Sequence, residues 1–319
     1  MRTILGVLRD IEREEEFRAT ETEPLPYVTA RPTDLTELVL TDALRWMAER
    51  DENSIHAILT DPPYGLVEFE EAQHRRLRTG ERGGVWRIPP TLNGVTRRPL
   101  PRFTVLTPKD RERLNSFFSA FAFHAHRVLV PGGHLVIASN PLVSTTTFAA
   151  VEAAGLEKRG EFVRVVKTLR GGDRPKNYEA EFSKVSVMPR SNWEPWGLFR
   201  KPISERNVAL NLRRWGTGGF ARITSLDPFH DMFTCPPARG EERKIAPHPS
   251  LKPQKLMRHL AKAVLPLGRG IILDPFAGSG STLAAADAVG FTAIGLERDP
   301  IYFQLAQSAI PRLAGLPIR

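Results

Sequence analysis

The sequence predicts an α/β fold built on one open, doubly wound and mostly parallel sheet. The alternation of predicted strands and helices and the composition support this prediction. Short apolar runs alternate with segments of helical periodicity along much of the chain, and strands that are separated by helices usually pair in parallel. The composition, with 41% hydrophobic and 25% charged residues, is that of a folded protein with one large core or two moderate ones.

The first elements follow an N-terminal segment to which we assign no chemistry. Residues 1–33, which are acidic and then proline-containing, are interpreted as a leader that precedes a domain at 34–319. Apolar runs predict a strand at 37–40 and a buried strand at 54–60, and helical spacing predicts a helix at 42–50 between them.

The middle of the chain continues the alternation. A long helix is predicted at 107–129, and the PGG at 131–133 is predicted to end it before a strand at 134–139. Helical spacing then predicts a helix at 141–155, which is followed by a strand at 162–169.

The C-terminal part repeats the same pattern after a long stretch that we interpret as irregular. A strand is predicted at 270–276, a helix at 280–290, a strand at 291–297 and a helix at 299–310. No internal repeat is found.

Charge and cysteine content narrow the classes of function. The formal net charge is +9 and the sequence pI is about 10.0, which favours an anionic partner such as a nucleic acid. The single cysteine, Cys235, excludes an internal disulfide and a multi-cysteine metal site, and no metal ligands are predicted. We see neither a signal sequence nor an apolar run near the ~18 residues that span a bilayer, so we expect a soluble, cytoplasmic protein.

Two motifs lie at the predicted carboxyl ends of strands, where doubly wound sheets bind their ligands. DPPY occupies residues 61–64, and DPFAGSGST occupies residues 274–282. In the second motif, we expect Gly278 and Gly280 to let the backbone approach a ligand, and we expect Ser281 and Thr282 to cap the next helix.

Acidic residues complete this second site. Asp274 is placed to accept hydrogen bonds from a cationic amine. Glu297 follows the glycines by about twenty residues, at the end of the next strand, where acidic side chains commonly bind ribose hydroxyls. Together with the glycines, these residues predict a ligand of the adenosine type.

DPPY and DPFAGSGST, in this order, resemble the motifs of the DNA amino-methyltransferases that use S-adenosyl-L-methionine, in particular the circularly permuted β group. The resemblance runs from about residue 38 to residue 310 and includes HPSLKPQKL at 248–256. It implies a seven-stranded, Rossmann-like methyltransferase sheet, with double-stranded DNA as the substrate. The chain departs from the family at 41–42, where Thr-Asp replaces the usual Gly-Asp.

The resemblance assigns catalysis to Asp61, Pro62, Pro63 and Tyr64. The lone pair of an exocyclic amine is delocalised into its ring, so both N–H groups must be held while the nitrogen becomes tetrahedral. The Asp61 carboxylate and the Pro62 carbonyl would be the two acceptors, with the backbone restricted by the prolines. Tyr64 would stack on a base rotated out of the duplex.

The resemblance also implies a set of residues around the cofactor. Asp274 and Gly278 would border its methionine part, Phe276 its adenine, and Glu297 its ribose. Asp42 would lie at the edge of the adenine. His248, Ser250 and Lys252 would close over the methionine carboxylate.

Two segments are predicted to touch DNA. Residues 74–102, within a basic insertion at 66–108, contain eight arginines and one glutamate. Such a segment neutralises phosphates, and it predicts a mobile arm. Its predicted contacts are Arg75, Arg76, Arg78, Arg87, Arg97 and Arg98. The resemblance places target recognition at 170–247, although the tryptophans there are equally suited to a core.

Several functions remain open. A C5-cytosine methyltransferase needs a thiolate that follows a proline, whereas Cys235 precedes one in TCPP. The aspartate of DPPY favours N6 of adenine as the target over N4 of cytosine, where the family often has serine. RNA as substrate and a catalytically silent DNA-binding relative are further alternatives. The resemblance is also compatible with a homodimer and with a cognate restriction endonuclease.

Overall fold

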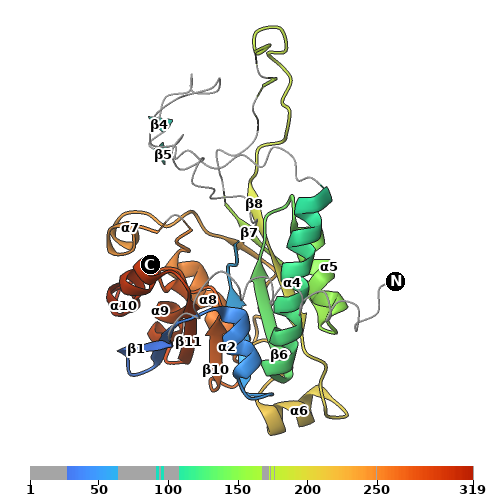
Figure 1. The fold of residues 1–319 in the computed structure, drawn as a ribbon, viewed down its shortest axis with the longest axis vertical. Helices are drawn as coiled ribbons and strands as arrows, with labels where there is room; N and C mark the ends of the chain where they lie inside the picture. Colours follow the sequence, from blue (N-terminus) through green and yellow to red (C-terminus); the bar gives the residue numbers. More distant parts are fainter. Residues whose placement is uncertain are drawn as a thin grey trace, which may run out of the picture.

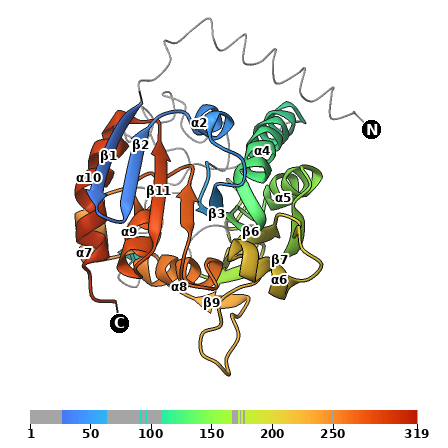
Figure 2. The ribbon, with the colours of Figure 1, turned by 90° about the horizontal axis from the view of Figure 1, so that it is seen from below.

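The computed structural model describes residues 27–63, 108–166, 177–248 and 250–318, together with Gly172, Arg174, Pro175 and the backbone of 91–92 and 95–96. Its main feature is a nine-stranded sheet in the order β1-β2-β11-β10-β3-β6-β8-β7-β9. The short strands β4 (Thr91–Leu92) and β5 (Val95–Thr96) pair separately. Helices lie on both faces of the large sheet (Figures 1 and 2).

The central strands are parallel neighbours. They are β2 (Thr36–Leu40), β11 (Thr292–Glu297), β10 (Ile271–Asp274), β3 (Ile55–Thr60) and β6 (Leu129–Ala138). This arrangement confirms the predicted α/β class with a mostly parallel sheet. The carboxyl ends of these strands therefore meet at one edge of the sheet.

The remaining strands complete the two sides. Strand β8 (Trp193–Arg200) runs antiparallel to β6 and to β7 (Glu157–Val165). At the outer edges, β1 (Val28–Thr33) pairs antiparallel with β2, and β9 (Met232–Thr234) pairs parallel with β7. These two edge strands extend the sheet beyond the seven strands that were expected.

Two layers of helices bury the two faces of the sheet. Helices α2 (Ala43–Glu49), α4 (Pro108–Val128) and α5 (Ser144–Ala153) share one apolar core with the sheet. Helices α8 (Gln254–Val264), α9 (Ser281–Ala288) and α10 (Pro300–Ala314) share the other. Figure 2 shows the two groups on opposite sides of the strands. No helix in the described part of the chain is both long enough and apolar enough to cross a membrane.

The leader and the PGG turn differ from the sequence prediction. The leader was expected to extend to residue 33, but Val28–Thr33 form strand β1, because their backbone pairs with β2. The PGG was expected to precede a strand, but it lies within β6, which begins directly after α4. The extra residues are absorbed where the register between β3 and β6 shifts, and Gly132 there has a φ of 81°.

The stretch after residue 170 is more ordered than the sequence suggested. It contains β8, α6 (Val208–Trp215), β9, α7 (Glu241–Ile245) and α8. Trp196 of β8 is fully buried. In α8, the buried residues Leu256, Met257, Leu260 and Val264 follow a helical spacing that the sequence analysis passed over.

Gly280 fixes the approach of α9 to α10. Its φ is 82°, and a Cβ atom there would lie 2.4 Å from Cγ1 of Ile310. Gly290 has the same φ, but a Cβ atom there would meet no atom within 4 Å. Gly290 therefore shows the effect of backbone strain alone, whereas Gly280 is also required by its close packing against Ile310. The predicted contact of Gly280 with a cofactor stays a prediction.

We predict that Gly290→Ala lowers the free energy of unfolding by about 1–2 kcal/mol, because the new side chain strains the left-handed backbone. Gly280→Ala should cost roughly 1–3 kcal/mol more, because it must also displace Ile310. Urea unfolding of both variants measures the difference. Equal losses in the two variants would show that the contact with Ile310 does not constrain residue 280.

Candidate active site

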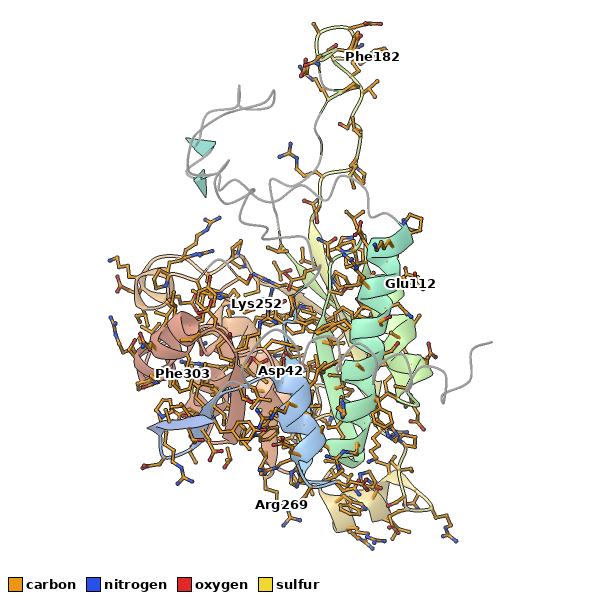
Figure 3. All side chains as sticks on the ribbon, in the orientation of Figure 1. Asp42, Glu112, Phe182, Lys252, Arg269 and Phe303 are labelled. Carbon is orange, nitrogen blue, oxygen red and sulfur yellow. The ribbon has the colours of Figure 1, made fainter. Side chains whose placement is uncertain are left out.

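The parallel strands bring the predicted acidic residues to one edge of the sheet. Asp42 follows β2, Asp61 follows β3, Asp274 ends β10 and Glu297 ends β11. Figure 3 labels Asp42 near the first turn of α2 and Lys252 above it, near the centre of the molecule. The positions of the motifs at strand ends predicted this gathering for Asp61, Asp274 and Glu297, and the family resemblance predicted it for Asp42.

The carboxylate of Asp274 joins the two motifs. One oxygen accepts a hydrogen bond from the hydroxyl of Thr60 at 2.7 Å and from the backbone N–H of Phe276 at 3.1 Å. The other oxygen accepts from the hydroxyl of Thr282. Burial raises the pKa of Asp274 to about 6, although these hydrogen bonds oppose the shift. Asp274 thus braces the site, and its contact with a cofactor amine stays a prediction.

The start of α9 differs from the expected capping. Ser281 and Thr282 were expected to cap this helix, but the N-cap is Gly280, and no side chain in the described part of the chain caps the helix. Thr282 instead turns its hydroxyl to Asp274. The buried carboxylate of Asp274 needs a hydrogen-bond donor. The hydroxyl of Thr282 could not have donated to it and capped the helix at the same time.

Glu297 and His248 enclose the backbone of Gly278. The N–H of Gly278 donates to Glu297 Oε2 at 2.8 Å, and the N–H of Asp299 donates to Oε1 at 2.8 Å. Burial raises the pKa of Glu297. A Cβ atom on Gly278 would lie 3.2 Å from Cε1 of His248, so the HPSLKP segment packs directly on the glycine loop.

His248 is held as a neutral ring. Its Nδ1 accepts the backbone N–H of Ser250 at 3.2 Å, and its ring meets Tyr302 edge-on at 4.4 Å. Burial, followed by the nearby charges of Arg243 and Lys252, lowers the pKa of His248 to about 4. Ser250 itself is exposed, and its predicted contact with the cofactor stays a prediction.

Asp42 and Phe276 both have structural partners. Asp42 is the N-cap of α2, and its Oδ1 accepts the N–H groups of Leu44 at 2.9 Å and Arg45 at 3.1 Å. The Phe276 ring packs against Phe117 and Phe121 of α4, with centroids 6.0 and 5.6 Å apart. Their predicted cofactor contacts remain predictions.

Lys252 reaches Asp61, which the sequence analysis did not anticipate. Its Nζ lies 2.7 Å from Asp61 Oδ2 and 3.4 Å from Glu194 Oε2. The backbone that follows Lys252 is fixed through Gln254, whose Nε2 donates to the carbonyl of Ser281 at 2.9 Å. HPSLKPQKL therefore connects the glycine motif to DPPY.

Glu194 is the residue that sequence analysis missed. Its Oε1 accepts the indole N–H of Trp196 at 2.8 Å, and Arg164 NH1 lies 3.4 Å from its Oε2. Burial raises the pKa of Glu194, but the charges of Lys252 and Arg164 and the hydrogen bond from Trp196 together lower it by more, so the net shift is downward. A glutamate between two tryptophans in NWEPW was the available signal, because charged residues in buried strands need partners.

Some predicted residues lie outside the described part of the chain. They are Tyr64, Arg75, Arg76, Arg78, Arg87, Arg97 and Arg98. Asp61, Pro62 and Pro63 are described, and they follow β3 directly, as DPPY at the end of a strand requires.

A sequence profile of the DNA methylase family N6_N4_Mtase matches residues 55–308. The chain belongs to the DNA methylase family. The matched range includes both motifs and the HPSLKP segment of this DNA methylase. Type II methyltransferase M.HindIII of Haemophilus influenzae is 23% identical over 288 residues, which cover 83% of this chain and 92% of that protein.

Solved structures share the fold of this DNA methylase. The PvuII DNA methyltransferase, which is cytosine-N4-specific, aligns with a TM-score of 0.58 at 13% identity and covers 91% of this chain and 95% of its own. TTHA0409 of Thermus thermophilus, solved in complex with S-adenosyl-L-methionine, aligns with a TM-score of 0.55 at 21% identity, covering 86% and 92%.

We predict a pH-dependent effect of Asp274→Asn. The pKa of Asp274 is raised from its ordinary 3.8 to about 6 in the folded protein. Its contribution to stability is therefore fully present below about pH 4 and is lost as the pH rises through 6. Because asparagine has no such titration, the variant should gain up to about 3 kcal/mol relative to the wild type between pH 4 and pH 8.

Urea unfolding across this pH range tests the prediction. A stability difference between Asp274→Asn and the wild type that stays constant with pH would show that Asp274 does not hold a proton more tightly when folded.

Proposed function

We propose that this DNA methylase transfers a methyl group from S-adenosyl-L-methionine to the exocyclic N6 of an adenine in double-stranded DNA. The observation that carries the proposal is the position of DPPY. Asp61 and Pro62 follow β3 directly, next to the β10 end where DPFAGSGST begins. The hydrogen bond from Thr60 to Asp274 joins the two motifs.

The residues at the end of β10 and β11 suit this cofactor. S-adenosyl-L-methionine, when bound, supplies a methyl group on a sulfonium centre. Gly278 has no side chain to fill the space beside His248, and Glu297 places an acidic group at that loop. We propose that Glu297 binds ribose hydroxyls, that Asp274, Gly278 and Lys252 border the methionine part, and that Phe276 lies near the adenine. The complex of TTHA0409 with the same molecule supports this choice.

Asp61 and Pro62 supply the two acceptors that the target amine needs. The side chain of Asp61 is only 13% exposed, so a hydrogen bond to it is screened little by water. As positive charge grows on the amine nitrogen, the carboxylate stabilises it and the Pro62 carbonyl holds the second N–H. The base must leave the duplex to reach them, and we assign Tyr64 to stack on it.

The choice of adenine depends on the motif and not on the fold. The cytosine-N4-specific PvuII enzyme has a similar fold, so N4 of cytosine is the second candidate target. The aspartate at position 61 favours adenine. Analysis of the methylated nucleosides after transfer from labelled cofactor separates the two targets, since N6-methyladenine and N4-methylcytosine are distinct products.

Two segments are proposed to hold DNA. We keep the basic insertion at 66–108 as the phosphate-binding segment. For recognition at 170–247, β8 is a poor candidate, because it lies inside the sheet. The segment 177–192 leads into β8 at the edge where β6 and β7 end, and it extends away from the sheet in Figure 1. A homodimer and a cognate endonuclease remain predictions.

We predict that Asp61→Ala abolishes most methyl transfer and leaves cofactor affinity within a few-fold, because Asp61 acts on the charge that develops in the transition state. Single-turnover transfer from labelled cofactor measures the first effect and calorimetry the second. A collapse of cofactor affinity would reassign Asp61 to cofactor binding.

We also predict that changing Arg75, Arg76, Arg97 and Arg98 together to Gln weakens binding to specific and non-specific DNA alike. The slope of log affinity against log salt should fall by up to about 0.9 for each lost phosphate contact. Arg312→Gln, in the last turn of α10, serves as a control for a change of charge elsewhere. An unchanged slope with lost discrimination between DNA sequences would mean that this segment reads bases.

A further inference from the structure

Four charged side chains form a continuous series that includes Asp61. Arg164 lies 3.4 Å from Glu194, Glu194 lies 3.4 Å from Lys252, and Lys252 lies 2.7 Å from Asp61. Their side chains are between 5% and 19% exposed. Charges so little exposed attract each other more strongly than they would at the surface, and each is costly without its partner.

Glu194 is the fixed member of the series. It stands on β8, directly opposite Arg164 on β7 in the antiparallel register. The indole N–H of Trp196, which is fully buried, donates to its second oxygen. Glu194 therefore has little freedom to move.

Arg164 is fixed as well. Its guanidinium donates to the backbone carbonyls of Cys235 and Pro236, both at 3.1 Å. This cation and the ammonium group of Lys252 both lie 3.4 Å from the same oxygen, Oε2 of Glu194. The negative charge of Glu194 balances two cations that would otherwise repel each other.

Lys252, by contrast, comes from the segment before α8 and has a long, flexible side chain. Its Nζ bridges Glu194 and Asp61, and it lies 5.9 Å from the centre of the Trp196 ring. The two carboxylates beside it therefore help to set the position of the ammonium group. Of these, Glu194 is the one built into the sheet.

We propose that Glu194 is a positioning residue for methyl transfer: it holds the ammonium group of Lys252 against Asp61, so that Asp61 stays ionised and aimed at the target amine. The proposal rests on the proposed function, in which Asp61 accepts a hydrogen bond from that amine. Glu194 touches neither substrate nor cofactor in this role, and it acts through Lys252.

The charges around Asp61 give the role a pH signature. Lys252 faces Asp61 from the segment before α8, Asp274 from β10, and Glu194 lies behind Lys252 on β8. Removing the Lys252 charge should raise the pKa of Asp61, because an adjacent cation is lost and two carboxylates remain nearby. Removing the charge of Glu194 as well should reverse part of that rise.

The first test is Glu194→Gln, which keeps the size and polarity of the side chain. Single-turnover transfer at saturating cofactor and DNA should slow roughly 10- to 100-fold, as expected for the loss of a charge-assisted contact. Glu161→Gln on β7 is the matched control, since it removes the exposed ion pair with Lys158 and should leave the rate unchanged. A Glu194→Gln rate equal to that of Glu161→Gln would overturn the proposal.

The second test separates positioning from simple support of the fold, and it applies even where Glu194→Gln folds poorly. In Lys252→Met, the pH at which the methyl-transfer rate falls on the acidic side of its pH profile (the acid limb) should rise by about one pH unit or more. The double variant Glu194→Gln/Lys252→Met leaves one positive charge, on Arg164, and one negative charge, on Asp61, in the series. Its acid limb should therefore lie at a lower pH than that of Lys252→Met. An acid limb that is the same in wild type and both variants would overturn the proposal.

A third measurement does not depend on activity. In a double-mutant cycle by urea unfolding, Glu194→Gln and Lys252→Met should together cost less than the sum of their separate losses, because each single change leaves a buried charge unbalanced. Additive losses would contradict the coupling. A wild type that methylates no DNA, or a fully active Asp61→Ala variant, would instead refute the proposed function, while this cycle would still report on the charged series.

Discussion

The hydrogen bond from Thr60 to the buried carboxylate of Asp274 joins two segments that are 214 residues apart in the sequence. Thr60 ends the strand that leads into DPPY, and Asp274 begins DPFAGSGST. Thr282 reaches the same carboxylate from the start of α9. Because a buried carboxylate without donors is costly, this set of contacts fixes the two motifs relative to each other. The placement of DPPY beside the glycine loop depends on it.

Because the parallel strands end at one edge of the sheet, the site there holds several acidic groups close together and with little access to water. Two of these groups differ in their electrostatic surroundings. Asp274 has a raised pKa because of its burial, and Asp61 has the cation of Lys252 beside it. The positive net charge of the chain would attract DNA from a distance, whereas this local balance concerns individual protons and hydrogen bonds. The net charge therefore affects the association with DNA, whereas the local balance of charge affects the groups within the site.

Several residues that the sequence predicts to bind the cofactor also make contacts that stabilise the fold. Asp42 caps α2, Phe276 packs on α4, and Gly280 makes room for Ile310. A motif residue can serve the fold and the site together, since the loops that bind a ligand must themselves be held in place. A substitution at such a position would change stability and binding at once, so stability must be measured beside activity.

The sequence by itself determined the α/β class, most of the elements in 36–60, 108–165 and 271–314, and the gathering of Asp61, Asp274 and Glu297 at one edge. Apolar periodicity and motifs at strand ends are local signals, and parallel pairing then brings the strand ends together. Strand β8 was missed because Pro195 and Gly197 are poor strand formers, and only the neighbouring strands β6 and β7 give them a place. The tertiary structure alone decided that Lys252 meets Asp61 and that Glu194 holds it. No local pattern encodes an ion pair between distant segments, because it forms only when the buried surroundings leave each charge no better partner.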